Sequence, residues 1–244
     1  MYVVKIGGSV LTDKKNPFSY RENVIKGIAK ALKGFKGVIV HGVGSFGHPL
    51  ALKYRLWEGV NGKCFEWAHT RLCVLKLHMI FLESLISEGI PAVTFGVANI
   101  KGYEGWYKET LKEFIDMGFV PVLHGDGVID REKGLKVISG DDIVAEIANI
   151  LRDKIKGVIF CVDVDGIYTD DPKTVPSAKL LKEISREEFL RFAKRGSDFS
   201  GGMMKKAQSI LKIPPQIPIY IINGLKPENI LKVFEGENPG TLIS

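Results

Sequence analysis

The chain has 244 residues, of which 45% are hydrophobic and 25% charged. This balance excludes a disordered chain, a collagen and a coiled coil. Lys and Arg exceed Asp and Glu by 34 − 28 = 6, without any block of five like charges, which favours small anionic partners over nucleic acid.

Apolar runs of strand length alternate with segments of helical spacing along the chain. In chain order the pattern predicts strand 2–6, helix 22–32, strand 37–41, helix 70–87, strand 91–95, helix 109–117, strand 119–124, helix 141–152, strand 157–162, helix 185–194, helix 202–211, strand 217–222 and helix 227–234. Such alternation is typical of a mainly parallel sheet with helices on both faces. We therefore expect an α/β protein, an open αβα sandwich.

Glycine and aspartate are concentrated in residues 125–134. This composition predicts a hairpin turn or a soft boundary rather than a flexible tether. We expect residues 1–134 and residues 135–244 to form two halves that share one sheet, or else one continuous domain.

Small residues gather at four predicted junctions that lead into helices. The junctions are residues 7–9 (GGS), 42–48 (GVGSFGH), 139–142 (SGDD) and 200–202 (SGG). Ligands of open α/β sheets sit beyond the carboxyl ends of the strands, and helix N-termini bind anions. A single glycine turn is most simply a requirement for positive φ. Four such turns with lysines beside them favour a cradle for phosphate groups.

Two familiar nucleotide motifs do not explain these turns. Residues 42–47 match G-x-G-x-x-G, but they follow the second predicted strand, and no strand closed by an acid follows about twenty residues later. The Walker pattern GxxxxGK[ST] is absent from the sequence. A dinucleotide-binding protein and an ordinary P-loop kinase are therefore disfavoured.

Three features bear on the compartment. The most apolar stretch, residues 72–86, is interrupted by Lys76, His78 and Glu83, which is not the pattern of a membrane span. The three cysteines form no CxxC pair, and the first five residues lack the layout of a signal peptide. We expect a cytoplasmic protein.

Six segments match, in order, the motifs of one family. They are residues 5–9 (KIGGS) with 12–14 (TDK), 41–48 (HGVGSFGH), 139–142 (SGDD), 162–172 (VDVDGIYTDDP), 200–206 (SGGMMKK) and 240–243 (GTLI). On these residues the chain resembles the amino acid kinase superfamily, and its SFGH run is most similar to that of the isopentenyl phosphate kinases. The resemblance implies transfer of the γ-phosphoryl group of ATP to isopentenyl phosphate by a homodimer. It also implies that Mg²⁺ accompanies ATP, although no protein ligand for the metal is identified.

The resemblance further implies how ATP is held. Lys5 and Lys206 contact its phosphates, with Lys205 as a competitor of Lys206, and Lys14 stabilises the transferring group. Asp141 orients these lysines, because a carboxylate between lysines keeps them charged and in place. The implied ATP-binding set also contains Gly7, Gly8, Ser9, Gly44, Asp163, Tyr168 and Gly202.

The acceptor is implied to lie at the second glycine turn. His48 donates a ring N–H to the acceptor phosphate, and the implied substrate-binding set is Val43, Gly47, His48 and Gly140. Three residues depart from the family pattern: Val43 replaces Gly, while Val162 and Ser200 replace Thr. Val43 matters most, because its side chain stands in the acceptor turn.

Several residues have a structural interpretation. Asp142 is interpreted as a helix cap, and His41 either orients the Gly42 turn or contacts a ligand. His69, Cys73 and His78 share one predicted helix at a spacing poor for metal binding and are interpreted as packing residues. The helical spacing of the same segment predicts a core face, formed by Leu72, Leu75, Met79, Leu82 and Ile86.

Two other functions remain open at this point. One is a different kinase of the superfamily, of which fosfomycin kinase is the hardest to exclude because its acceptor is also a phosphorus oxyanion. The other is a nucleotide-binding sensor that lost turnover through Val43.

Overall fold

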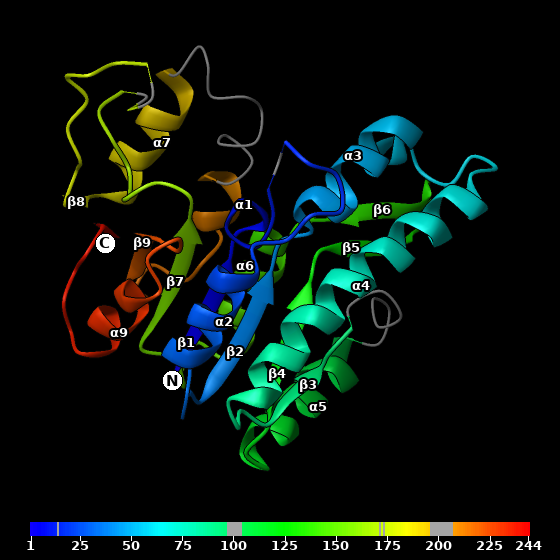
Figure 1. The fold of residues 1–244 in the computed structure, drawn as a ribbon, viewed down its shortest axis with the longest axis horizontal. Helices are drawn as coiled ribbons and strands as arrows, with labels where there is room; N and C mark the ends of the chain where they lie inside the picture. Colours follow the sequence, from blue (N-terminus) through cyan, green and yellow to red (C-terminus); the bar gives the residue numbers. More distant parts are fainter. Residues whose placement is uncertain (14, 97–103, 171, 173, 196–206) are drawn as a thin grey trace.

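A computed structural model describes residues 1–13, 15–96, 104–170, 172, 174–195 and 207–244. Its centre is an eight-stranded sheet in the order β3-β4-β2-β1-β7-β9-β10-β8 (Figure 1). All neighbouring strands run parallel except β9 and β10. The strands are β1 (Tyr2–Ile6), β2 (Gly37–His41), β3 (Ala92–Thr94), β4 (Val120–His124), β7 (Gly157–Val162), β8 (Glu183–Ile184), β9 (Ile219–Asn223) and β10 (Thr241–Ile243).

Two hydrophobic cores lie on opposite faces of the sheet, because successive strand residues point to opposite sides. Val3 belongs to one core and Val4 to the other, and both are fully buried. The Val3 face is covered by α5 (Glu104–Asp116), α6 (Gly140–Ile150) and α7 (Arg186–Arg195). The Val4 face is covered by α1 (Gly8–Leu11), α2 (Glu22–Ala31), α3 (Gly44–Tyr54), α4 (Cys64–Ser87) and α9 (Glu228–Phe234) (Figure 1). The predicted open αβα sandwich is confirmed.

The structure corrects several predicted bounds. The helix predicted to begin at residue 70 begins at Cys64, and the helix predicted to begin at residue 109 begins at Glu104. The sequence prediction also missed α3, whose glycines and Pro49 hide its helical spacing, and the very short elements α1, η1 (Leu56–Glu58), β8 and β10. The predicted helix 202–211 lies partly outside the described residues, and residues 207–210 are helical.

The glycine-rich stretch after β4 is the hairpin that its composition predicted. Strand β5 (Asp126–Asp130) pairs antiparallel with β6 (Gly134–Ile138). The hairpin packs beside η1, where the Val60 nitrogen donates to the Lys133 carbonyl at 2.9 Å. The hairpin begins directly after β4 and leads directly into α6, so it lies at the edge of the sheet where β4 ends. The two predicted halves share one sheet, since β1 pairs with β2 on one side and with β7 on the other.

No helix in the described part of the chain is long and apolar enough to cross a membrane.

Candidate active site

Three of the predicted small-residue junctions meet at the carboxyl edge of the sheet. Strand β1 lies beside β2, so residues 7–9 and residues 42–48, which follow these strands, are neighbours. Residues 139–142 follow β6 and join them, since a Cβ at Gly140 would lie 3.4 Å from the His41 carbonyl oxygen. The turns after β1 and β2 touch through their backbones: a Cβ at Gly8 would lie 2.5 Å from the Gly44 nitrogen, and a Cβ at Gly42 would lie 2.5 Å from the Gly8 nitrogen. Side chains at these glycines would force the turns apart. Both turns open helices, whose first N–H groups have no acceptor within the helix and attract anions.

Lys5 brings a buried positive charge to this edge. It precedes the last residue of β1 and shares the face of Val3, which is covered by α6. Its side chain is 8% exposed, and Nζ lies 3.0 Å from Asp141 Oδ1 on the first turn of α6. Gly140 flanks the lysine stem, since a Cβ there would lie 3.5 Å from Lys5 Cε. A buried ammonium held by one carboxylate at a helix N-terminus is ready to bind an anion without moving.

Asp142, next to Asp141, has a different task. Its backbone N–H donates to Ser139 Oγ at 3.1 Å, and its carboxylate accepts hydrogen bonds from the Ser139 backbone N–H and hydroxyl, which makes a capping box. Burial raises the pKa of Asp142, but hydrogen bonds from Ser209 and Ser139 outweigh it, so the pKa lies below the ordinary value. The interpretation of Asp142 as a helix cap is confirmed.

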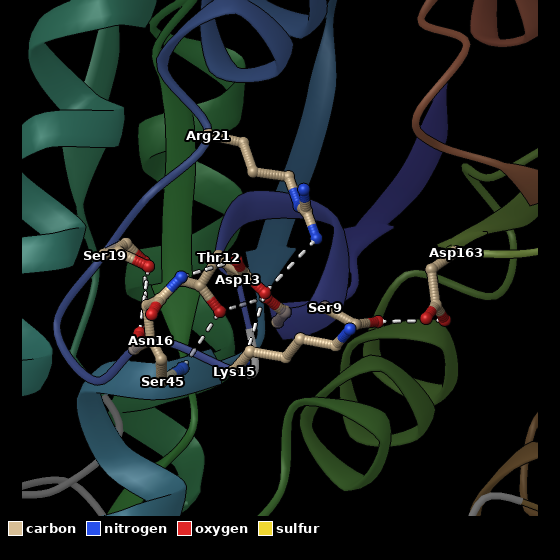
Figure 2. A network of polar contacts seen from close by, with 10 residues as sticks. Ser9, Thr12, Asp13, Lys15, Asn16, Ser19, Arg21, Ser45 and Asp163 are labelled. Atoms are coloured by element: carbon tan, nitrogen blue, oxygen red, sulfur yellow. Dashed lines mark hydrogen bonds and ion pairs between the residues drawn. The ribbon is translucent and has the colours of Figure 1, made fainter.

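The end of β7 carries two aspartates with separate partners. Asp163 accepts a hydrogen bond from Ser9 Oγ at 3.1 Å, which ties the end of β7 to α1 (Figure 2). Asp165 accepts from Lys226 Nζ at 2.8 Å and from Asn223 Nδ2 at 2.9 Å. The hydrogen bond from Lys226 is the main cause that lowers the pKa of Asp165. The Tyr168 hydroxyl donates to Asp165 at 3.4 Å, so Tyr168 contacts Asp165.

Val43 fits in the turn after β2 because two glycines leave room for its side chain. A Cβ at Gly47 would lie 2.6 Å from Val43 Cγ2, and a Cβ at Gly125 would lie 3.3 Å from Val43 Cγ1. The valine side chain therefore packs between α3 and the end of β4. His48 follows one residue after Gly47 on α3, and its side chain is exposed. The extra side chain of Val43 is thus accommodated by packing around α3.

Three buried histidines form a cluster that the sequence did not predict. His41 at the end of β2, His124 at the end of β4 and His78 on α4 are 0%, 5% and 0% exposed. His41 Nε2 lies 2.9 Å from His78 Nδ1, and His78 Nε2 lies 2.9 Å from Thr94 Oγ1. His41 Nδ1 lies 3.1 Å from the Gly42 carbonyl, which accepts only. His41 Nδ1–H therefore donates to Gly42, which leaves His41 Nε2 to accept from His78 Nδ1–H. His78 Nε2 then accepts from the Thr94 hydroxyl.

These contacts explain the acid–base state of the cluster. Burial, and then the charge of His124, lowers the pKa of His78 to about 4. Burial, followed by the charges of His124 and His78, lowers the pKa of His41 well below its ordinary value. Both rings are therefore neutral at pH 7. His41 is buried and orients the Gly42 turn. His78 is a buried packing residue, as expected, and its ring packs against those of His41 and His124.

The predicted core face of α4 was wrong in part. Leu82 is 8% exposed and packs in the core, but Leu72, Met79 and Ile86 are 54%, 49% and 53% exposed. Their spacing of seven residues places them on one side of α4, together with Phe65, which is 75% exposed. We call these four residues the α4 stripe.

Within the described part of the chain, the predicted site residues fall into three groups. One group lies at the adjoining turns: Lys5, Gly7, Gly8, Ser9, Gly44, Gly140, Asp141 and Asp163. A second group lies on or at α3: Val43, Gly47 and His48. Tyr168 is turned toward Asp165. Lys14, Lys205, Lys206 and Gly202 lie outside the described residues. Sequence reasoning assigned no contact to Thr12, whose hydroxyl joins the first two turns.

Comparisons with known proteins bear on the family and the fold of the chain. The model described as the amino acid kinase family matches residues 1–223. The chain is similar to the isopentenyl phosphate kinases of Thermoplasma acidophilum (34% identity, 100% of both chains) and Methanothermobacter thermautotrophicus (35% identity, 100% of this chain and 99% of the relative). It also superposes on the crystal structure of the T. acidophilum isopentenyl phosphate kinase product complex, with a TM-score of 0.83, 32% identity and full coverage of both chains.

Proposed function

The chain belongs to the amino acid kinase family, and on that premise we propose that it phosphorylates isopentenyl phosphate with ATP, giving isopentenyl diphosphate and ADP. Its full-length relatives carry the name isopentenyl phosphate kinase. The observation that carries the proposal is the position of His48. Its exposed side chain lies on the first turns of α3, directly after the two glycine turns that touch each other. An imidazole N–H there suits a phosphate acceptor.

The chemistry asks for alignment of two anions rather than for a base. A phosphate monoester has a second pKa of about 6, so the acceptor is already largely a dianion at neutral pH. One of its oxygens forms a bond to the γ-phosphorus of ATP, and the bond from that phosphorus to the β–γ bridging oxygen breaks, with its electron pair leaving on ADP. The protein supplies positive charge and N–H donors around the transferring group.

We assign the donor side to the turns after β1 and β7. Lys5, held by Asp141, faces the phosphates, while the turn that begins at Gly7 offers the backbone N–H groups of Gly8 and Ser9. The Gly7 N–H itself donates to the Cys161 carbonyl at 2.8 Å. Asp163 holds Ser9 in place from the neighbouring strand. By resemblance, Lys14, Gly202 and Lys206, with Lys205 as its competitor, complete the phosphate contacts, and Gly44 and Tyr168 complete the ATP set.

We assign the acceptor to α3 and its surroundings. His48 binds the acceptor phosphate, and Val43, Gly47 and Gly140 shape the space around it. In this assignment residues 1–134 form the acceptor half and residues 135–244 the ATP half, and each half also contributes to the other site: Lys5 and the turn after β1 to ATP, and Gly140 to the acceptor.

We propose Mg²⁺ as the ion that accompanies ATP. In the described part of the chain no three His, Cys, Asp or Glu side chains gather into a metal-binding group. Asp163 and Asp165, the nearest carboxylates beyond β7, are engaged by Ser9 and by Lys226. The described residues therefore do not fit a metal held by the protein itself, and Mg²⁺ commonly binds through substrate phosphates and water.

We propose that a second copy of the chain covers the α4 stripe, giving a homodimer. Four large apolar side chains in a line are unusual on a surface that faces only water. A single helix face is self-complementary about a two-fold axis, as a symmetric dimer requires. We also propose a cytoplasmic location, because all three cysteines are free thiols, as reducing compartments keep them.

The assignment of His48 is tested by His48→Ala. Loss of one donor to a transition-state anion typically lowers turnover about 100-fold or more. We expect that loss in turnover of isopentenyl phosphate, with the Kd for ATP changed less than about threefold, because His48 lies on the acceptor side. His69→Ala is the control, since His69 lies half-buried on α4 and touches Tyr54. Equal loss of turnover and ATP affinity, or no loss of either, would contradict the assignment.

A further inference from the structure

A single buried hydroxyl connects the two glycine turns of the site. Thr12 ends α1 and is 0% exposed. Its Oγ1 donates to the Gly8 carbonyl at 2.7 Å and accepts from the Ser45 nitrogen at 2.9 Å (Figure 2). Gly8 belongs to the turn after β1, and Ser45 is the second residue of α3, three residues before His48. Both hydrogen-bonding capacities of the hydroxyl are used across the junction of the two turns.

The backbone around Thr12 is shaped to let the hydroxyl approach. Gly44 has a φ of 48°, and a Cβ there would lie 2.2 Å from Thr12 Oγ1 and 2.8 Å from the Gly8 carbonyl oxygen. A side chain at Gly44 would therefore occupy the position of the hydroxyl. The same glycine that allows the left-handed turn into α3 also leaves the space for Thr12.

The segment that starts at Thr12 returns to the same point on α3. Thr12 pairs with Tyr20 in an antiparallel bridge. The Ser45 carbonyl accepts a hydrogen bond from the Phe18 nitrogen at 3.4 Å, and the Ser45 hydroxyl donates one to the Ser19 carbonyl at 3.0 Å. Asp13 accepts from the Lys15 nitrogen at 3.1 Å (Figure 2). The described parts of residues 12–20 are thus anchored at both ends on the N-terminus of α3.

We propose that Thr12 is a positioning residue for phosphoryl transfer: its hydroxyl sets the spacing between the turn that holds the ATP phosphates and the helix that carries His48. The proposal rests on the proposed function of the site. Its basis is that Thr12 bonds to backbone groups of both turns, so it acts through them. Phosphoryl transfer requires the reacting atoms to be about 3–3.5 Å apart, and a displacement of about 1 Å can cost 100-fold in rate.

The test is a pair of substitutions at the same position. Thr12→Val keeps the branched shape and removes the hydroxyl, whereas Thr12→Ser keeps the hydroxyl and removes a methyl group. We expect Thr12→Val to lower kcat about 30-fold or more, with KM for isopentenyl phosphate and Kd for ATP each within about threefold of the parent. Thr12→Ser should retain at least a third of the parent kcat. Both variants are measured below their unfolding midpoints, so that folded protein is compared.

Amide hydrogen exchange gives a readout that does not depend on turnover. In Thr12→Val the Ser45 N–H loses its acceptor, and we expect its exchange to accelerate about tenfold or more, while Thr12→Ser keeps the parent rate. The proposal is overturned if Thr12→Val keeps its kcat, if Thr12→Ser loses as much as Thr12→Val, or if Ser45 exchange is unchanged. A parent protein that fails to turn over isopentenyl phosphate refutes the proposed function instead, and Ser45 exchange then decides whether the Thr12 link itself exists.

Discussion

Acid is expected to destabilise this fold through two members of the histidine cluster, His41 and His78. In the unfolded chain His78 binds a proton near pH 6.5, whereas in the folded chain it does not bind one until the pH falls to about 4. The unfolded state therefore holds more protons between these values, so the stabilising effect is complete above pH 6.5 and is lost as the pH falls toward 4. A pKa difference from 6.5 to about 4, at about 1.4 kcal/mol for each unit, corresponds to about 3 kcal/mol from His78. The lowered pKa of His41 acts in the same direction.

The assay is urea unfolding at a series of pH values from 4.5 to 7.5, with the free energy of unfolding extrapolated to water. His78→Gln keeps hydrogen-bonding groups at the site but cannot take up a proton. Between pH 6.5 and pH 4.5, we expect the free energy of unfolding of the parent to fall by about 2–3 kcal/mol more than that of His78→Gln. His69→Gln, on the same helix and half-buried, serves as the control and should follow the parent. Parallel pH profiles for His78→Gln and the parent would refute the reasoning.

Three further predictions concern other contacts of the structure. Asp141→Asn leaves the buried ammonium of Lys5 without its carboxylate, so we expect at least tenfold lower kcat/KM in steady-state assays and a loss of about 3 kcal/mol in urea unfolding; an unchanged kcat/KM would contradict the role of the pair. Gly47→Ala should cost about 1–3 kcal/mol because its Cβ meets Val43 at 2.6 Å, and adding Val43→Gly should recover most of that loss in thermal unfolding; additive effects would show that the two do not touch. Leu72→Glu should convert a dimer into a monomer in analytical ultracentrifugation, whereas a monomeric parent would contradict the proposed use of the α4 stripe.

The parts of the fold that follow local patterns were predictable from the sequence. Alternating strands and helices gave the parallel sheet, and the period of two within each strand separates Val3 and Val4 onto opposite faces. The Ser139–Asp142 capping box was predictable because it is built from residues three apart. The family motifs predicted that Asp141 lies close to Lys5, and the structure places their charged atoms 3.0 Å apart.

What the sequence could not show depends on contacts between distant segments. Helical spacing marks an apolar face but does not say whether another element covers it, so Leu72 looked like a core residue although it is 54% exposed. His78 lies 37 residues from His41, and only the packing of α4 against β2 brings their rings together. The link from Thr12 to Ser45 spans 33 residues and depends on how two turns meet. Hydrogen bonds of this kind leave no periodic signal along the chain.

The central claim is tested most directly by ADP release from purified protein with Mg-ATP and isopentenyl phosphate, run beside dimethylallyl phosphate, fosfomycin, UMP and acetylglutamate. We predict turnover that is selective for the two isoprenoid monophosphates, with Val43 as a tolerated variation in the acceptor turn. Turnover of another acceptor in their place would contradict the assigned substrate while leaving the kinase fold intact. Binding of ATP without turnover of any acceptor would contradict the proposed activity and favour a nucleotide-binding sensor.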